Sequence, residues 1–167
     1  MRKNIQHAAF AFLLAIVFQS CYSFTGASIP PHIHTIGIPL AEDISGFGQS
    51  EVPQDLTRII TDKFTREGSL QVAGRTNADA LLTITISHIT DESVGVRTGE
   101  TLTNKRVSIF IQATYFDQKK QKQFWQRDFQ QSADYPIAQN LVGLKAAIAS
   151  AEDKMSEEIL LAVISNW

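Results

Sequence analysis

The sequence predicts an α+β protein, in which a mostly antiparallel β-sheet has two helices packed on one face. Residues 80–90 and 105–116 alternate between apolar and polar side chains, which is the period of a strand with one exposed face. Residues 53–67 and 141–164 instead repeat apolar side chains at helical spacing. Polar turns join consecutive strands into hairpins, and helices that precede and follow such a run favour a layer of helices on one side of the sheet.

The first part of the predicted domain contains a short strand followed by a helix. The apolar run His34–Pro39 predicts a strand that ends at its proline, and the acidic, glycine-containing segment 40–50 predicts a loop. Pro53 suits the first turn of the helix over 53–67, and Gly68 suits the position just after its end. The apolar stripe of this helix comprises Leu56, Ile59, Ile60 and Phe64.

The middle of the chain predicts a short strand at 70–73 and three longer strands at 80–90, 105–116 and 123–131. The face expected to lie on the core carries Leu82, Ile84, Ile86 and His88 in one strand and Val107, Ile109, Ile111, Ala113 and Tyr115 in the next, with Trp125 and Phe129 sharing a face of the third. The opposite face is expected to present Thr83, Thr85, Ser87, Ser108 and Gln112 to solvent or to a partner.

The last helix, 141–164, is the longest predicted element. Its apolar stripe comprises Leu141, Leu144, Ile148, Ala151, Met155, Ile159 and Ala162, and we expect this stripe to pack on the core rather than to form a seam with a partner. Acidic residues are expected to mark its solvated side: Glu152, Asp153, Glu157 and Glu158.

The first 20 residues are typical of a signal peptide. Arg2 and Lys3 precede an uncharged apolar stretch that is too short to span a bilayer, and small Ser20 stands directly before the single cysteine, Cys21. We therefore expect lipid attachment at Cys21, a lipidated tether over 21–31 and one α+β domain over 32–167. Phe18 departs from the aliphatic residue usual in a bacterial lipobox, so a plain secretory signal is the alternative interpretation.

Such an anchor would place the chain at a bacterial membrane. Each buried acyl CH₂ contributes about 0.8 kcal/mol, and several chains together hold a protein effectively permanently. Tyr22 replaces the Asp that retains some lipoproteins in the inner membrane, which favours the outer membrane. We expect the domain to lie on the periplasmic side.

Composition and motifs argue against several other classes of function. The net charge is −2, so the chain lacks the positive charge that would favour nucleic acid as a partner. A single cysteine permits no internal disulfide, and His32 and His34 alone do not complete a metal site. His88 is most simply a residue at the end of a strand. Because no nucleophile motif is present, we expect no catalytic residue, no metal and no cofactor, although a periplasmic hydrolase stays open as an alternative.

The basic residues suggest a binding surface. Lys119, Lys120 and Lys122 crowd one predicted hairpin turn beside Phe124 and Trp125, and such a turn can bind phosphate headgroups. Lys105 and Arg106 are expected at the opposite end of the same hairpin. The alternative is an ordinary solvated turn whose charges protect the sheet edge from pairing.

Several motifs, in this order, resemble those of lipopolysaccharide-assembly lipoproteins of the LptE type. The predicted mature chain opens Cys21–Ile29 with CYSFTGASI, followed by the strand TIGIP and by a helix that contains Asp55-Leu56 and Lys63-Phe64. Asp79-Ala80-Leu81-Leu82 leads into a strand, and the chain ends Asn166-Trp167. The resemblance extends over essentially the whole mature chain; Phe18 and the segment 91–103 depart from it.

This resemblance implies a non-enzymatic lipoprotein on the periplasmic side of the outer membrane, with a sheet and two helices. It implies that the chain plugs a large outer-membrane β-barrel translocon for lipopolysaccharide and helps that barrel assemble, and some members bind lipopolysaccharide. The basic residues that bind lipopolysaccharide in the family cannot be matched individually to this sequence. The expectation that Lys119, Lys120 and Lys122 bind lipopolysaccharide therefore rests on the charge and position of these lysines and not on the resemblance. The alternative is a general periplasmic lipoprotein accessory of a secretion or envelope-stress system.

Overall fold

The computed structural model describes residues 29–95 and 103–165. The predicted signal peptide, Cys21 and the terminal Asn166-Trp167 lie outside the described residues. The elements are β1 (Thr35–Gly37), β2 (Glu42–Asp43), α2 (Val52–Glu67), β3 (Gln71–Ala73), β4 (Ala80–Val94), β5 (Asn104–Asp117), β6 (Lys122–Pro136), the 3₁₀ turn η1 (Ile137–Gln139) and α3 (Asn140–Ile164).

The strands form one mixed sheet that is mostly antiparallel, as predicted. Its order is β3-β1-β4-β5-β6, and the three long strands β4, β5 and β6 pair as antiparallel hairpins. The short strand β1 lies parallel to both β3 and β4. Helix α2 accounts for the parallel pairing of β1 with β3, because two parallel neighbours need a crossover between them. The segment predicted as a loop also contains β2, which pairs with β4 at Thr85 and Ile86.

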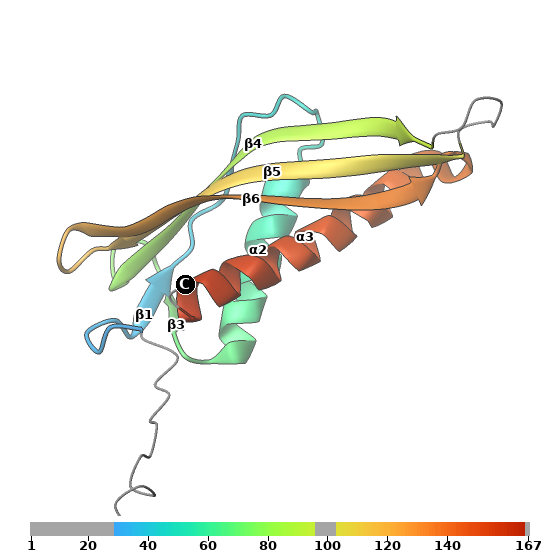
Figure 1. The fold of residues 1–167 in the computed structure, drawn as a ribbon. Helices are drawn as coiled ribbons and strands as arrows, with labels where there is room; N and C mark the ends of the chain where they lie inside the picture. The colour runs from blue at the N-terminus through green and yellow to red at the C-terminus, as the bar shows by residue number, and fades with distance from the viewer. Residues whose placement is uncertain (1–28, 96–102, 166–167) are drawn as a thin grey trace, which may run out of the picture.

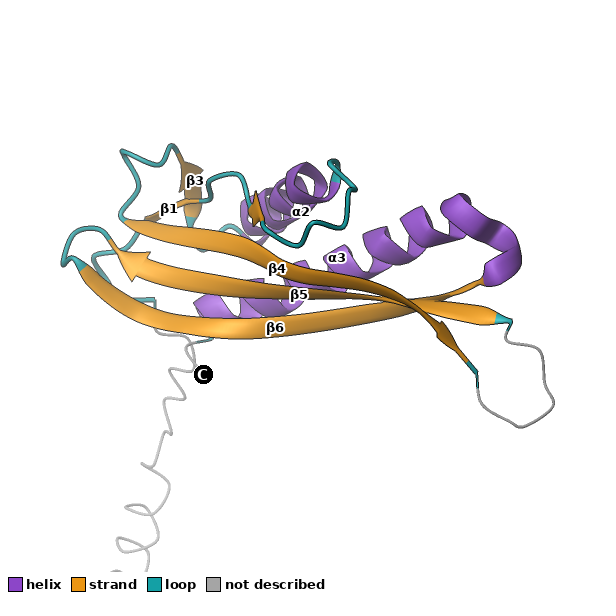
Figure 2. Ribbon diagram, turned by 90° about the horizontal axis from the view of Figure 1, so that it is seen from above, coloured by secondary structure: helices purple, strands orange, loops and turns teal. Residues whose placement is uncertain are grey.

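Both helices pack on the same face of the sheet, which confirms the predicted architecture (Figures 1 and 2). The core contains the inward faces of β4 and β5 together with the stripes of α2 and α3. Its fully buried members include Leu56, Ile60, Phe64, Leu82, Ile86, Ile109, Ile111, Met155 and Ile159. Neither described helix is long and apolar enough to cross a bilayer.

A β-bulge in β4 changes which residue of that strand enters the core. The pairing with β5 shifts between Ile86 and His88, so Ser87 is an extra residue. The alternation predicted His88 on the core face; instead His88 is exposed and Ile89 is buried. On the opposite face Ser87 and Gln112 are exposed as expected, Thr83 and Thr85 are partly exposed, and Ser108 is buried.

The solvated side predicted for α3 needs one correction. Asp153, Glu157 and Glu158 are exposed, but Glu152 is buried, with only 3% of its surface exposed. Glu152 lies on the side of α3 that faces α2, because α2 covers part of the surface that helical periodicity alone assigns to solvent. The stripe also needs a correction at its start, because Leu141, expected to pack on the core, is 53% exposed in the first turn of α3.

Candidate functional site

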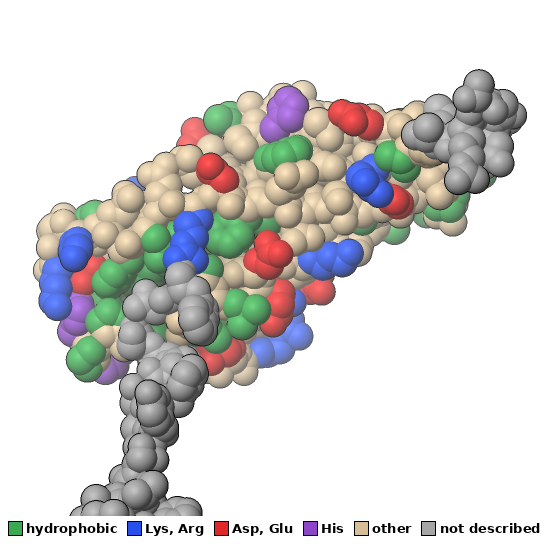
Figure 3. All heavy atoms as spheres, in the orientation of Figure 1, with side chains coloured by type: hydrophobic (Ala, Val, Ile, Leu, Met, Phe, Trp, Pro, Cys, Tyr) green, Lys and Arg blue, Asp and Glu red, His purple; other side chains and the backbone are tan. Residues whose placement is uncertain are grey.

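The predicted lysine cluster occupies the tight turn between β5 and β6. Asp117 pairs with Lys122 across the hairpin, and Gln121 adopts a left-handed backbone conformation with φ 50°. Its side-chain amide donates a hydrogen bond to the Gln118 carbonyl at 2.7 Å. Lys119, Lys120 and Lys122 are all exposed. In the space-filling view, Lys and Arg side chains gather at the end of the molecule that carries this turn (Figure 3).

Lys119 is fixed to the body of the domain. Its ammonium group lies 2.8 Å from Asp79 Oδ1 and donates to the His32 carbonyl at 3.0 Å. These contacts join the hairpin turn to two segments that are distant in sequence, one before β1 and one before β4. Lys119 therefore has a structural role in addition to its charge.

Asp79 organises the ends of two strands. Its Oδ2 accepts hydrogen bonds from the backbone N–H groups of His34 at 2.7 Å and Thr35 at 3.0 Å, and its own N–H donates to Thr35 Oγ1 at 2.8 Å. The hydrogen bond from Lys119, followed by those from the two backbone groups, holds the pKa of this carboxyl well below its usual range. Asp79 is therefore ionised throughout the physiological pH range.

Asp117 supports the turn from inside. It is 1% exposed; its Oδ2 lies 2.7 Å from His32 Nε2, and its Oδ1 accepts the Lys120 N–H at 2.9 Å. Burial opposes ionisation, but the hydrogen bonds from His32 and from the turn outweigh it and lower the pKa of this carboxyl. His32 is thus engaged with Asp117. No cluster of three metal-binding side chains occurs in residues 29–95 and 103–165.

Lys120 and Lys122 differ from Lys119 in their surroundings. Within the part of the chain that the structure describes, neither ammonium group forms an ion pair. Two exposed, uncompensated positive charges thus stand beside a third that Asp79 orients. This arrangement suits a ligand with clustered negative charge, such as phosphate groups.

The aromatic residues beside the turn point inward. A shift of register between Tyr115 and Phe116 makes Phe124 an extra residue in β6, and its ring stacks on Tyr115 at 4.9 Å between centroids. Trp125 lies 5.8 Å from the Tyr115 ring and has the Arg127 guanidinium 5.3 Å from its own centroid. Both Phe124 and Trp125 pack against the hydrophobic core and close its end, with part of each ring left exposed.

The other basic pair, at the opposite end of the hairpin, is neutralised. Lys105 lies 2.7 Å from Asp91 Oδ2, and Arg106 donates from its Nη2 to Asp134 Oδ2 at 2.9 Å. Tyr135 also donates to Asp91, at 2.8 Å. This end therefore offers less uncompensated positive charge than the lysine turn does.

Sequence patterns assigned no contact to Asp79 or Asp117, and they placed Glu152 on the solvated side of its helix. Asp79 lies directly before β4 and Asp117 is the last residue of β5. An acid at the end of a strand often accepts hydrogen bonds from exposed backbone N–H groups, so these positions carried a weak signal. Nothing local marks their partners, because Asp79 and Lys119 meet only when β4 pairs with β5, which sets Ala80 opposite Asp117. Cys21, the predicted lipid-attachment residue, lies outside the described residues.

Comparisons with known proteins agree with this architecture. The model of a family described as LptE, lipopolysaccharide-assembly, matches residues 33–165. Protein XCC0632 from Xanthomonas campestris has a similar structure, with a TM-score of 0.63 and 14% identity over 81% of this chain and 88% of that chain. Rare lipoprotein B from Shewanella oneidensis matches with a TM-score of 0.53 and 10% identity, covering 77% and 92% of the two chains.

A dodecameric protein shares the same fold. The PelC dodecamer from Paraburkholderia phytofirmans has a TM-score of 0.54 and 9% identity, covering 84% of this chain and 94% of that chain. At these identities the likenesses to solved structures show the fold alone. None of the curated proteins matches this sequence.

Proposed function

The chain belongs to the LptE family of lipopolysaccharide-assembly proteins, and from this premise we propose that it plugs an outer-membrane β-barrel translocon for lipopolysaccharide and assists the assembly of that barrel. The family is non-enzymatic, so this chain is a lipopolysaccharide-assembly lipoprotein and not an enzyme. The observation that carries the proposal is the extent of the match, which includes every described element from β1 to α3.

The surface of the sheet is compatible with a position inside a barrel. Its helix-free face carries hydroxyl and amide side chains, among them Thr85, Ser87 and Gln112. The lumen of an outer-membrane barrel is lined by polar residues. A rigid sheet with a polar outer face can therefore fill such a lumen without exposing its own core.

We propose that acyl chains on Cys21 hold the domain at the membrane. The described chain begins at Ile29, close to His32 and hence to the lysine turn. Eight residues of extended chain reach at most roughly 29 Å. An anchor at Cys21 would therefore keep the turn end of the domain near the lipid headgroups.

The lysine turn is the proposed contact for the phosphate groups of lipopolysaccharide. Lys120 and Lys122 would supply mobile charges, and Lys119 a charge held in place by Asp79. Replacing all three by Ser should weaken lipopolysaccharide binding by at least tenfold, since each lysine near an anionic lipid surface is worth about 1 kcal/mol. The K120S/K122S double variant should show most of this loss with an unchanged melting temperature; equal binding by wild type and triple variant would make the turn plain solvated surface.

Purification of the tagged full-length chain from outer membranes tests the proposed function. We expect a large β-barrel protein to co-purify, and depletion of the chain to cause loss of surface lipopolysaccharide together with misassembled barrel. Cys21→Ser should abolish palmitate labelling and release the chain from the membrane. Recovery without any barrel, and normal surface lipopolysaccharide after depletion, would favour a general periplasmic accessory instead.

A further inference from the structure

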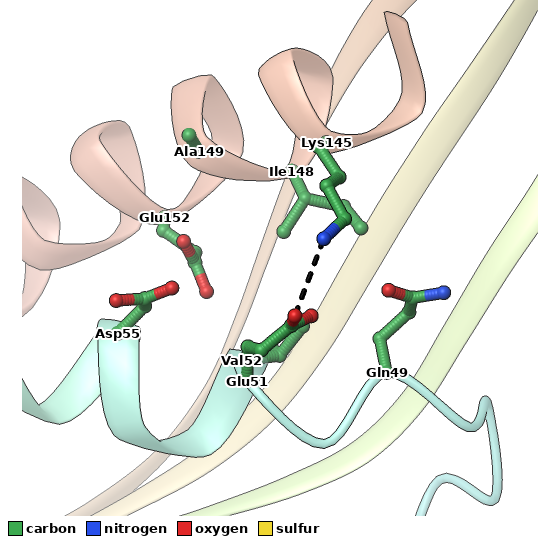
Figure 4. A pocket seen from close by; sticks show the side chains of 8 residues that line it. All are labelled: Gln49, Glu51, Val52, Asp55, Lys145, Ile148, Ala149 and Glu152. Carbon is green, nitrogen blue, oxygen red and sulfur yellow. Dashed lines mark hydrogen bonds and ion pairs between the residues drawn. The ribbon is translucent and has the colours of Figure 1, made fainter. Parts of the chain in front are cut away.

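A cavity of about 180 Å³ lies between the start of α2 and the first half of α3, and no residue of the lysine turn lines it. Figure 4 shows the side chains that line it, which come from both helices and from the segment just before α2. They are Gln49, Glu51, Val52, Asp55, Lys145, Ile148, Ala149 and Glu152. The proposed function uses none of these residues.

The buried carboxyl of Glu152 is the unusual feature of this cavity. Glu152 is 3% exposed, and its Oε1 has no hydrogen-bond partner among the described residues. Its carboxyl group points from α3 toward Asp55 on α2 (Figure 4). A buried polar atom without a partner costs free energy, so its position at the wall of a cavity points to a ligand that supplies the missing contact.

The charges around Glu152 leave it without a cation of its own. At the rim, Lys145 lies 3.2 Å from Glu51, and both side chains are more than half exposed. Arg58 pairs with Asp55 at 3.0 Å. Lys145 is thus already matched by Glu51, and Arg58 by Asp55 and, at 3.8 Å, by Asp62. The carboxyl of Glu152 is the third acid that lines the cavity, after Glu51 and Asp55.

The size and lining of the cavity define the ligand. No set of three metal-binding groups occurs here or elsewhere in the described residues, which disfavours a metal ion. A cavity of roughly 150 Å³ can hold a group the size of benzene. Val52, Ile148 and Ala149 offer apolar contacts for an alkyl stem beside the carboxyl. An alkyl chain that ends in a planar, charged donor group fits both properties.

We propose that this cavity receives an arginine side chain of a partner protein, whose guanidinium group pairs with Glu152 while its stem lies against Val52 and Ile148. Arginine is the basic residue best suited to such a site, because its guanidinium is weakly hydrated and binds carboxylates through two parallel hydrogen bonds. That the partner is the barrel of the translocon rests on the proposed function; the binding of the guanidinium group does not.

Butylguanidinium and its neutral isostere butylurea test the site directly. With the full chain in detergent micelles, titration followed by NMR should show butylguanidinium shifting the resonances of Ile148 and Glu152, and butylurea shifting neither. Glu152→Gln keeps the shape but cannot release a proton to form the carboxylate that pairs with a guanidinium group, so it should weaken butylguanidinium binding at least tenfold. Lys145→Gln leaves Glu51 unpaired at the rim and should tighten binding severalfold. Equal binding of the two probes, or unchanged affinity in E152Q, would overturn the proposal.

A pull-down separates this inference from the proposed function. If the wild-type chain co-purifies with a barrel, E152Q should recover at least tenfold less of it, and E92Q, which changes an exposed glutamate elsewhere, should recover the same amount as wild type. Full recovery with E152Q would refute the arginine contact and leave the translocon role intact. Absence of a barrel from the wild-type preparation would refute the translocon role, whereas binding of butylguanidinium would still support the site.

Discussion

Replacing Glu152 by Gln should stabilise the protein, and by an amount that grows with pH. Burial first, and then the neighbouring charge of Asp55, raise the pKa of the Glu152 carboxyl from 4.5 to about 8, against an opposing effect of Arg58. Glu51 and Lys145 also face this carboxyl across the cavity. In the folded chain without a bound cation Glu152 is therefore protonated at pH 7, whereas in the unfolded chain it is ionised. A guanidinium group in the cavity would favour the ionised form and displace this proton.

The sign and the size of the effect follow from this difference in proton binding. Between the two pKa values the folded state holds one proton more than the unfolded state, so the free energy of unfolding falls as pH rises. The slope is about 1.4 kcal/mol per pH unit, which amounts to about 3 kcal/mol at pH 7. The stabilisation that the folded chain gains by binding this proton is complete below pH 4.5 and is lost by about pH 8. Glutamine does not titrate, so E152Q should escape this loss.

Urea unfolding followed by tryptophan fluorescence, at several pH values between 4.5 and 8, measures the difference between E152Q and wild type. We expect it to be near zero at the acid end and to reach about 3 kcal/mol at pH 7. The exposed Glu92 supplies the control, since E92Q should differ from wild type by a small amount that does not vary with pH. A difference between E152Q and wild type that stays constant or shrinks as pH rises would refute this account of Glu152.

Two further substitutions test other parts of the structure. Asp79→Ala removes the acceptor of two backbone N–H groups and should lower the free energy of unfolding by about 3 kcal/mol. Lys119→Ser loses only a half-exposed ion pair and should lower it by at most about 1 kcal/mol. Similar losses in the two urea titrations would mean that Asp79 does not organise this end. The bulge at Ser87 buries Ile89 and exposes His88. Ile89→Ala should therefore lower the free energy of unfolding by about 3 kcal/mol, and His88→Ala by less than about 0.5 kcal/mol. A lower melting temperature for H88A than for I89A would contradict the bulge.

The sequence by itself determined the two helices and the three long strands. In each, the spacing of apolar residues is a property of neighbours a few positions apart, and the core uses it directly: Leu56, Ile60 and Phe64 on α2, and Val107, Ile109 and Ile111 on β5, are all buried. The helix stop at Gly68 was also predictable, since its left-handed backbone, with φ 80°, suits glycine best. The lysine turn followed from the same local chemistry of polar residues between two strands.

Only the tertiary structure decided which polar residues would be buried or joined. The burial of Glu152 depends on α2 lying over it, and the contact of Lys119 with Asp79 depends on the pairing of β4 with β5. The bulge at Ser87 depends on the register between β4 and β5, which one inserted residue changes for every side chain beyond it. Periodicity describes a single element, whereas burial of a charge and the register of two strands are properties of pairs of elements that meet only in the folded chain.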